Sequence, residues 1–343
     1  MRGIVIAGGL GTRLRPLTLT RPKPLMPLVN APLLEYQLSY LRKAGITEVC
    51  FATNYMADAV ERHFGDGSRY GMKLVYAIED EPLGTGGAIR NAYDALPPGD
   101  CAVFNGDTIH AFDIAAIIRR HLERGADATL TLIRVDRPHP YGVVPLNGEG
   151  RVQGFLEPSD EQKRGLNDAS AGGTDNINAG LYVLTARVLD SFPQGPSSVE
   201  HDVFPRIIEE GRGVFGDVQE AYWIDIGRPV QYLEAVRAVI AGEVGAARPI
   251  RVVGGCAVDK TAEIHEEAQV SDGTSVGPHV RIGRGAVVTG SILLKGVEVG
   301  CGARIERSVV DEGSRIGANA TVRDAVLEAN AVVPDQSVVS GQM

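Results

Sequence analysis

Hydrophobic and polar residues follow one pattern up to about residue 240 of the 343-residue chain and a different pattern beyond it. In the first part, short apolar runs alternate with stretches in which apolar residues recur at helical spacing. Strands are expected at residues 3–7, 48–52, 74–78, 102–104 and 128–135. Helices are expected at residues 33–44, 57–64, 86–95 and 114–124. This alternation predicts a doubly wound α/β fold with a mainly parallel sheet, in which ligands bind beyond the carboxyl ends of the strands.

The pattern changes near residue 245, where helical spacing disappears. Apolar residues recur first at every sixth position and then at alternating steps of 11 and 6, which make a 17-residue period. The period aligns Gly296, Gly313 and Asn330, which suit left-handed turns. It predicts a triangular solenoid of about five coils rather than a sandwich of short strands. The inward positions are expected at Val252, Val258, Ile264, Val270, Val276, Ile282, Val288, Val299, Ile305, Ile316, Val322, Val333 and Val339.

These two patterns predict two domains, residues 1–240 and residues 250–343. The composition is ordinary for a globular protein, and the net charge of −9 argues against a protein that coats nucleic acid. The first strand begins almost at Met1, which leaves no room for a signal peptide, and no apolar run approaches the roughly 20 residues that span a membrane. The four cysteines show no C-x-x-C pattern, so we expect reduced thiols and a cytoplasmic protein without a membrane partner.

A glycine-rich turn directly after the first strand carries the strongest chemical signal. Gly8, Gly9 and Gly11 would let backbone N–H groups approach an anion. Four cations that could neutralise phosphates follow within eleven residues, namely Arg13, Arg15, Arg21 and Lys23. Neither the P-loop pattern nor the dinucleotide pattern G-x-G-x-x-G fits this segment.

The segment resembles the signature of sugar-1-phosphate nucleotidyltransferases, G-G-x-G-T-R-L-x-P-L-T followed by P-K-P. The resemblance implies a Rossmann-like catalytic domain that transfers a nucleotidyl group from a nucleoside triphosphate to a sugar 1-phosphate. Arg13 would hold the β- and γ-phosphates, and Lys23 would stabilise charge on the α-phosphate. The nucleotide would also lie on the backbone at Ala7, Gly8, Gly9, Gly11 and Thr12.

Three further segments resemble motifs of this family. The loop Pro82-Leu-Gly84-Thr85-Gly86-Gly looks like the one beside the base and sugar, so Glu81, Pro82, Gly84 and Thr85 are expected at the nucleotide and Gly86 at the sugar phosphate. We also expect Thr85 to be the N-cap of the helix that follows. Asn178 in N-A-G-x-Y would bind sugar hydroxyls, Gly142 would offer its N–H, and Glu200 lies in another acidic motif of the family or at a solvated helix start.

Two aspartates that follow apolar runs, Asp107 and Asp225, match the metal-binding positions of the family. Magnesium needs one or two carboxylates together with substrate phosphate oxygens, so the pair predicts a Mg²⁺ site, with Asp107 also close to the sugar phosphate. One motif departs from the family: relatives carry F-x-E-K-P, whereas this chain has Phe155-Leu-Glu157-Pro158. Glu157 remains a predicted sugar ligand, and Lys163 or Arg164 would have to replace the missing lysine.

The sequence leaves the substrates open. The G-T-G-G loop and the C-terminal repeats resemble mannose-1-phosphate guanylyltransferases, and Glu79 or Glu81 could accept hydrogen bonds from guanine, so GTP and mannose 1-phosphate are our first prediction. Thymidylyl or uridylyl transfer to glucose 1-phosphate is an alternative, and a non-catalytic nucleotide-sugar-binding paralogue is another. The repeats resemble the hexapeptide left-handed β-helix, in which acyltransferases use a histidine such as His265 or His279. We instead expect a structural role that joins copies into a homo-oligomer.

Overall fold

The computed structural model describes residues 1–137, 139, 141–156 and 173–341. They form two compact units, and the chain passes between these units more than once. The first unit comprises Met1–Gly9, Gln37–Thr108 and Phe112–Trp223, and the second comprises Leu10–Tyr36, Ile109–Ala111 and Ile224–Met343.

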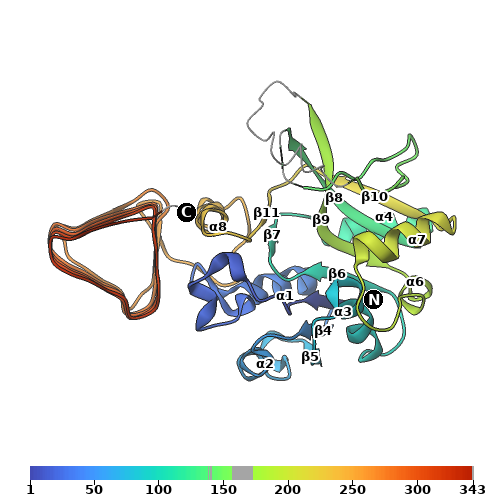
Figure 1. Cartoon of the computed structure of the whole chain (residues 1–343), viewed down its shortest axis with the longest axis horizontal. Helices are drawn as coiled ribbons and strands as arrows, with labels where there is room; N and C mark the ends of the chain where they lie inside the picture. Colours follow the sequence, from blue (N-terminus) through green and yellow to red (C-terminus); the bar gives the residue numbers. More distant parts are fainter. Residues whose placement is uncertain (138, 140, 157–172, 342–343) are drawn as a thin grey trace. The chain divides into compact units, whose positions relative to one another are not determined.

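The first unit is built on a seven-stranded sheet with the order β10-β8-β9-β6-β1-β4-β5 (Figure 1). Its strands are β1 (Arg2–Ile6), β4 (Glu48–Thr53), β5 (Lys73–Ile78), β6 (Cys101–Asn105), β8 (Ala128–Asp136), β9 (Thr174–Leu184) and β10 (Val214–Gln219). Only β9 among these seven strands runs antiparallel to its neighbours, so the predicted mainly parallel sheet is confirmed.

Helices pack against this sheet, and apolar side chains from both fill the core. The helices are α1 (Leu33–Lys43), α2 (Ala57–Phe64), α3 (Gly84–Asp94), α4 (Ile114–Arg124), α6 (Ala186–Asp190) and α7 (Phe204–Glu209). The first residues of α1 belong to the second unit, and the π-helical turn η5 (Val199–Val203) directly precedes α7. All four predicted helices are present. Helix α3 begins at Gly84, so Thr85 is not its N-cap as we expected, and its hydroxyl accepts a hydrogen bond from Val199 N at 2.9 Å instead.

The second unit contains the predicted solenoid, whose strands stack into a triangular tube (Figure 1). The tube has three parallel sheets. The first contains β13 (Cys256–Val258), β16 (Ser275–Val276), β19 (Ile292–Leu293), β22 (Val309–Val310) and β25 (Val326–Leu327). The second contains β14 (Glu263–Ile264), β17 (Arg281–Ile282), β20 (Glu298–Val299), β23 (Arg315–Ile316) and β26 (Val332–Val333), and the third contains β15 (Gln269–Ser271), β18 (Val287–Thr289), β21 (Arg304–Glu306), β24 (Thr321–Arg323) and β27 (Val338–Ser340).

The 17-residue period is confirmed by the strand pairing, in which Ile282, Val299, Ile316 and Val333 stack above one another. Gly296, Gly313 and Asn330 all have φ near +60° to +70°, as expected for the turns of this β-helix. The position predicted at Val252 is wrong, because β12 (Val252–Val253) pairs antiparallel on the end of the first sheet and leaves Val252 47% exposed.

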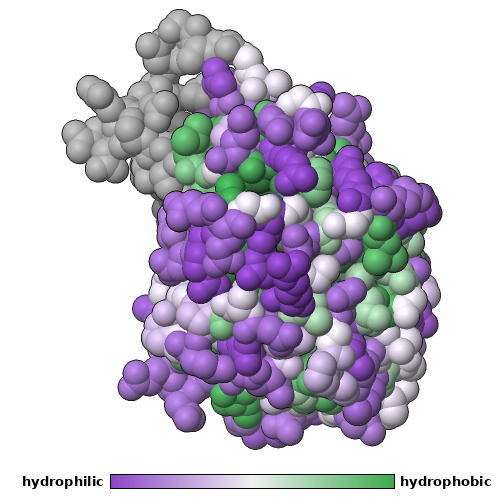
Figure 2. Space-filling model, turned by 90° about the vertical axis from the view of Figure 1, so that its right-hand side faces the viewer, coloured by the Kyte–Doolittle hydropathy of each residue, from purple (hydrophilic) through white to green (hydrophobic). Residues whose placement is uncertain are grey.

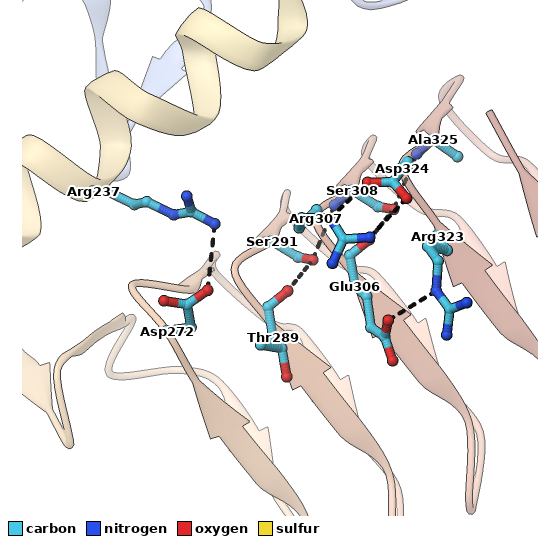
Figure 3. Close-up of polar contacts among 10 residues, drawn as sticks. All are labelled: Arg237, Asp272, Thr289, Ser291, Glu306, Arg307, Ser308, Arg323, Asp324 and Ala325. Carbon is cyan, nitrogen blue, oxygen red and sulfur yellow. Dashed lines mark hydrogen bonds and ion pairs between the residues drawn. The ribbon is translucent and has the colours of Figure 1, made fainter. Parts of the chain in front are cut away.

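A column of buried hydroxyls stabilises one corner of the β-helix (Figure 3). Ser291 Oγ accepts a hydrogen bond from Ser308 N at 3.0 Å, and Ser308 Oγ accepts one from Ala325 N at 3.2 Å. Each hydroxyl also donates to the carbonyl two residues earlier, Thr289 O or Glu306 O. Ser291 and Ser308, one 17-residue period apart, therefore satisfy backbone N–H and C=O groups at this corner.

Part of the glycine-rich segment packs with the β-helix in the second unit. This part consists of three short helical turns, η1 (Thr12–Leu14), η2 (Leu17–Leu19) and η3 (Lys23–Leu25), and a small hairpin of β2 (Pro27–Leu28) and β3 (Ala31–Pro32). The Tyr232 hydroxyl of α8 (Pro229–Ala241) donates to Pro27 O, and Arg248 forms an ion pair with Glu35. The remaining strands, β7 (Thr108–His110) and β11 (Trp223–Asp225), form a two-stranded sheet of their own.

Polar residues predominate on the face of the molecule in Figure 2, where apolar residues form only small separate patches. No helix in the described ranges is long and apolar enough to cross a membrane. The four cysteines carry free thiols, of which Cys50, Cys101 and Cys256 are buried.

Candidate active site

The carboxyl ends of β1, β4, β5 and β6 lie on one edge of the sheet in the first unit, because these strands are parallel neighbours. The pairing of Ile6 with Asn105 puts the turn Ala7–Gly9 beside Gly106 and Asp107. Two strands away, the β5 end delivers Glu79, whose N–H donates to Thr53 O at 2.8 Å. The first part of the predicted phosphate turn and one predicted metal ligand therefore share one edge, as expected for this fold class.

The glycines of this edge have different roles. A Cβ on Gly106 would lie 2.6 Å from Ile6 O, and one on Gly8 would lie 3.2 Å from Asn54 Cβ, so these two glycines allow neighbouring segments to pack. A Cβ on Gly9 would meet nothing within 4 Å. Open space therefore lies beside Gly9, on the side where a Cβ would stand.

The loop before α3 is fixed from inside the protein. Glu79 is buried, and its Oε2 accepts a hydrogen bond from Leu83 N at 3.0 Å. Burial raises the pKa of the Glu79 carboxyl, and the hydrogen bond from Leu83 opposes this rise. Glu79 is thus held by the loop itself, whereas Glu81, the other predicted guanine acceptor, is exposed.

The glycines at the start of α3 face another segment of the protein. A Cβ on Gly84 would lie 2.6 Å from Ser197 O, and one on Gly87 would lie 2.4 Å from Gly195 O. Gly86 N already donates to Ser197 O at 2.8 Å. These glycines therefore permit close approach of the 195–197 backbone, and the expected contact of this loop with a ligand stays a prediction.

The predicted sugar-binding strand β9 brings Asn178 together with Glu200. Asn178 Nδ2 donates to Glu200 Oε1 at 2.8 Å and to the Tyr182 hydroxyl at 2.7 Å, while its Oδ1 accepts from Gly180 N at 3.0 Å. Gly180 is required here, because its φ is +74° and a Cβ would lie 2.4 Å from Asn105 Nδ2. Tyr182 is fully buried, and this burial raises the pKa of its hydroxyl.

Sequence reasoning left Glu200 between a site residue and a solvated helix start, and the contact with Asn178 supports the first reading. The signal was present in the acidic motif around Glu200. The sequence did not show that Asn178 of β9 and Glu200 of η5 pair, because this contact depends on how the chain folds between the two elements.

Gly142 and its neighbour Tyr141 lie in a segment held by aromatic and ionic contacts. Tyr141 packs edge-to-face on Trp223 with ring centroids 5.9 Å apart, and Trp223 Nε1 donates to Ala179 O at 2.9 Å. Asp175, at the start of β9, contacts both Arg137 and His139, and the Arg137 guanidinium lowers the pKa of Asp175. The predicted Glu157 and the possible lysine substitutes Lys163 and Arg164 lie outside the described residues.

In the second unit, Arg13, Asp225 and Gly227 form one group. A Cβ on Gly227 would lie 3.0 Å from Arg13 Nη2 and 3.2 Å from Asp225 Oδ2, so a larger residue there would have to displace the ends of these two side chains. Gly11 enters η1 in the left-handed region with φ +60°, and Thr18 Oγ1 donates to Gly11 O at 2.9 Å. These contacts fix the turn that carries Thr12 and Arg13. Sequence reasoning missed Gly227, although it follows Asp225 by only two residues.

The other cations of the segment have different surroundings. Lys23 begins η3 and is 8% exposed. Arg21 Nη1 lies 2.7 Å from Oδ1 of Asp311, a residue of the β-helix, and Arg21 Nη2 lies 3.5 Å from Glu312 Oε1. The prediction that Arg21 neutralises phosphates is therefore corrected, because its charge is already balanced by carboxylates of the protein.

The chemistry of the two aspartates suits a hard divalent cation. Asp107 follows β6, and Asp225 ends β11, and both supply only oxygen ligands. No group of three or more histidine, cysteine or acidic side chains in the described ranges could hold a metal by itself.

The sequence matches the model of the nucleotidyl transferase family over residues 2–242. The chain belongs to this family. Residues 252–343 match the GMPPB C-terminal domain, which accounts for the β-helix. The chain is thus a nucleotidyltransferase, and enzymes of this family generally use a divalent metal ion.

Several relatives resemble the chain over most of its length. It is 38% identical to the mannose-1-phosphate guanylyltransferase of Mycobacterium tuberculosis (strain ATCC 25618 / H37Rv) over 296 residues, which cover 86% of this chain and 80% of the relative. It is 35% identical to a probable mannose-1-phosphate guanylyltransferase 1 of Oryza sativa subsp. japonica, with the same coverage. Among solved structures, HddC from Yersinia pseudotuberculosis complexed with GMP-PN is 31% identical, with a TM-score of 0.57 over 68% of this chain and 98% of HddC.

Proposed function

We propose that this nucleotidyltransferase converts GTP and mannose 1-phosphate into GDP-mannose and pyrophosphate, with Mg²⁺ as the metal. The observation that carries the choice of substrates is the similarity to mannose-1-phosphate guanylyltransferases at 32–38% identity over 86% of the chain. The chain also carries the signature residues Arg13 and Lys23 and the two predicted metal ligands, Asp107 and Asp225.

In this proposal a phosphate oxygen of the sugar attacks the α-phosphorus of GTP in line, and pyrophosphate leaves. The attacking oxygen is already ionised, so the protein needs no strong general base. Catalysis then depends on positioning and on neutralising charge. Arg13 holds the β- and γ-phosphates, and Lys23 stabilises the charge that develops on the α-phosphate.

The remaining predicted residues orient the two substrates. The backbone of Ala7–Gly9 faces the nucleotide, and the loop from Glu81 to Thr85 lies beside guanine. Asn178, held by Glu200 and Tyr182, binds sugar hydroxyls. Gly142 contributes its N–H, and Gly86 borders the sugar phosphate.

Asp107 and Asp225 would hold Mg²⁺, which supplies charge neutralisation between the α-phosphate and the leaving group. Their carboxylates, without nitrogen or sulfur ligands, favour Mg²⁺ over softer metals. Asp225 belongs to the same group as Arg13 around Gly227, so phosphate and metal contacts would be fixed together.

We also propose a cytoplasmic location and a homo-oligomer joined through the β-helix. The free thiols are typical of a reducing compartment. Val332 and Val338 of the β-helix are both more than two-thirds exposed, and a second copy could cover them.

The experiment that tests the reaction measures pyrophosphate release with Mg²⁺ for GTP, dTTP, UTP, ATP and CTP, each combined with mannose 1-phosphate or glucose 1-phosphate. The proposal predicts preferred turnover of GTP with mannose 1-phosphate. Preference for dTTP or UTP with glucose 1-phosphate would replace the substrate assignment. Binding of GDP-mannose without release of pyrophosphate from any pair would indicate a non-catalytic paralogue.

A further inference from the structure

A groove of about 620 Å³ lies within the second unit. It is lined by Arg13, Arg15 and Pro16 of the glycine-rich signature segment (residues 8–24), by Arg228 and Pro229, and by the last coils of the β-helix. One wall carries three arginines, Arg13, Arg15 and Arg228. The opposite wall is mainly apolar and is formed by residues of β25 and β27, with Val326, Leu327 and Val339 at its surface. The volume is in the range of sites for small molecules.

The three arginines differ in their surroundings from the paired arginines of the second unit. All three are exposed, and in the part of the chain that the structure describes none of them has a hydrogen bond or an ion pair with a carboxylate. By contrast, Arg21, Arg248 and Arg307 are each paired with an acidic side chain. Three like charges along one groove repel one another, and this repulsion is relieved when an anion binds between them.

The one carboxylate in the groove does not cancel this charge. Asp324 lies on the β-helix wall, and its two oxygens accept hydrogen bonds from Arg307 at 2.6 and 2.7 Å (Figure 3). The Arg307 guanidinium lowers the pKa of Asp324, which is therefore ionised but already paired. The groove keeps a positive wall and an almost uncharged opposite wall.

We propose that Arg15 and Arg228 extend the phosphate contacts of Arg13 into this groove, and that the groove binds a polyphosphate anion with the end of the β-helix as its second wall. Each guanidinium group can bind two phosphate oxygens at once. Three guanidinium groups therefore suit a polyphosphate, which carries several negative charges, better than they suit a ligand with a single phosphate group. The β-helix then forms one wall of a ligand site and is more than a structural support.

The polyphosphate has two possible sources. It can be the triphosphate of the substrate or the pyrophosphate product, because Arg13 belongs both to the groove and to the proposed active site. It can also be a separate phosphorylated effector. The first source rests on the proposed function, whereas binding of inorganic pyrophosphate can be measured without any turnover.

The test is isothermal titration of the full chain with inorganic pyrophosphate. We expect Arg15→Gln and Arg228→Gln each to raise the Kd about tenfold, with a larger effect in the double variant, because each removes a charge-assisted contact. Arg304→Gln is the matched control: it removes the same charge from an exposed arginine of β21 that does not line the groove, and it should leave the Kd unchanged. An unchanged Kd in the double variant would overturn the proposal.

A variant of the opposite wall provides an independent measurement. Val326→Asp puts a carboxylate opposite the arginines, so it should weaken pyrophosphate binding without touching a cation. Unimpaired binding by folded Val326→Asp would contradict a site that uses this wall. The melting temperature of each variant, measured in parallel, identifies variants that fail to fold.

Competition identifies the source of the polyphosphate. If saturating GTP displaces pyrophosphate, the groove receives the phosphates of the substrate and product. If pyrophosphate binds equally well beside GTP, the groove serves a separate effector. If no substrate pair gives turnover while Arg15→Gln and Arg228→Gln still weaken pyrophosphate binding, the groove is confirmed as an anion site and the proposed reaction is wrong.

Discussion

The carboxyl edge of the mixed sheet and the coils of the β-helix use polar residues in different ways. At the sheet edge, Ala7–Gly9, Glu79 and Asp107 follow the ends of neighbouring strands, and open space lies beside Gly9. On the β-helix, charged side chains are matched to one another across coils, as in Arg323 with Glu306 and Arg307 with Asp324. The partner of a charged residue, rather than its charge, therefore indicates whether the residue acts on a ligand or on the fold.

The signature segment shows the same contrast within twenty residues. Arg21 is balanced by Asp311 of the β-helix, whereas Arg13 lies beside Gly227 and lines the groove. By residue type and spacing alone, both arginines are candidates for phosphate binding, and only the resemblance to the family singles out Arg13. The predictions that follow separate catalytic charges from structural ones.

The largest effect is expected at the sheet edge. Asp107→Asn keeps the size of the side chain and removes a metal-binding charge, so turnover with Mg²⁺ should fall by about 10³-fold or more. The melting temperature should change little, because the residue lies at a strand end rather than in the core. Near-normal turnover at saturating Mg²⁺ would show that Asp107 is not a metal ligand.

Lys23→Ala should lower kcat by about 10²-fold, on the order of 3 kcal/mol, because the ammonium stabilises charge that develops in the transition state. The KM for GTP should change much less than kcat. Initial rates over a range of GTP concentrations separate the two parameters. A rise in KM with unchanged kcat would contradict the proposed contact with the α-phosphate.

Asp311→Asn tests whether the ion pair between Arg21 and Asp311 stabilises the fold. Asp311 is 0% exposed and Arg21 is 13% exposed, so this variant leaves a largely buried guanidinium without its carboxylate. We expect a loss of about 3 kcal/mol in the free energy of unfolding, measured by denaturant titration. Glu312→Gln is the control: Glu312 is 43% exposed and 3.5 Å from Arg21, so it should cost less than about 1 kcal/mol. Equal losses in the two variants would refute the role given to burial.

Gly227→Ala should have the smallest effect of these variants, and the effect should be on GTP binding rather than on stability. Its Cβ would press on the end of the flexible Arg13 side chain, which can move at little cost to the fold. We expect the KM for GTP to rise about tenfold, or roughly 1.4 kcal/mol, with an unchanged melting temperature. A drop in melting temperature without a change in KM would mean that Gly227 serves packing alone.

Much of this architecture could be predicted because it depends on local periodicity. The helices at 57–64 and 114–124 follow from apolar spacing, and the coils follow from a period that their stacking must repeat. Val252 was assigned to the wrong environment because its spacing fits the repeat, although it precedes the first full coil and has no inner face to fill.

The site was less predictable because it depends on contacts between distant residues. The sequence identified Asn178 and Arg13 as candidates, but their neighbours Glu200 and Gly227 come from other elements. Gly84 and Gly86 show the limit most clearly, because a glycine needed to pack against Ser197 has the same appearance in a sequence as one needed by a ligand.

The central claim is that Arg13 acts on the substrate while Arg21 acts on the fold. The most direct measurement determines kcat, the KM for GTP and the melting temperature for Arg13→Gln and Arg21→Gln side by side. The account predicts that Arg13→Gln loses turnover at an unchanged melting temperature. It predicts that Arg21→Gln melts earlier but keeps most of its turnover per folded molecule below its transition. Loss of turnover in Arg21→Gln at an unchanged melting temperature, or early melting of Arg13→Gln, would contradict it.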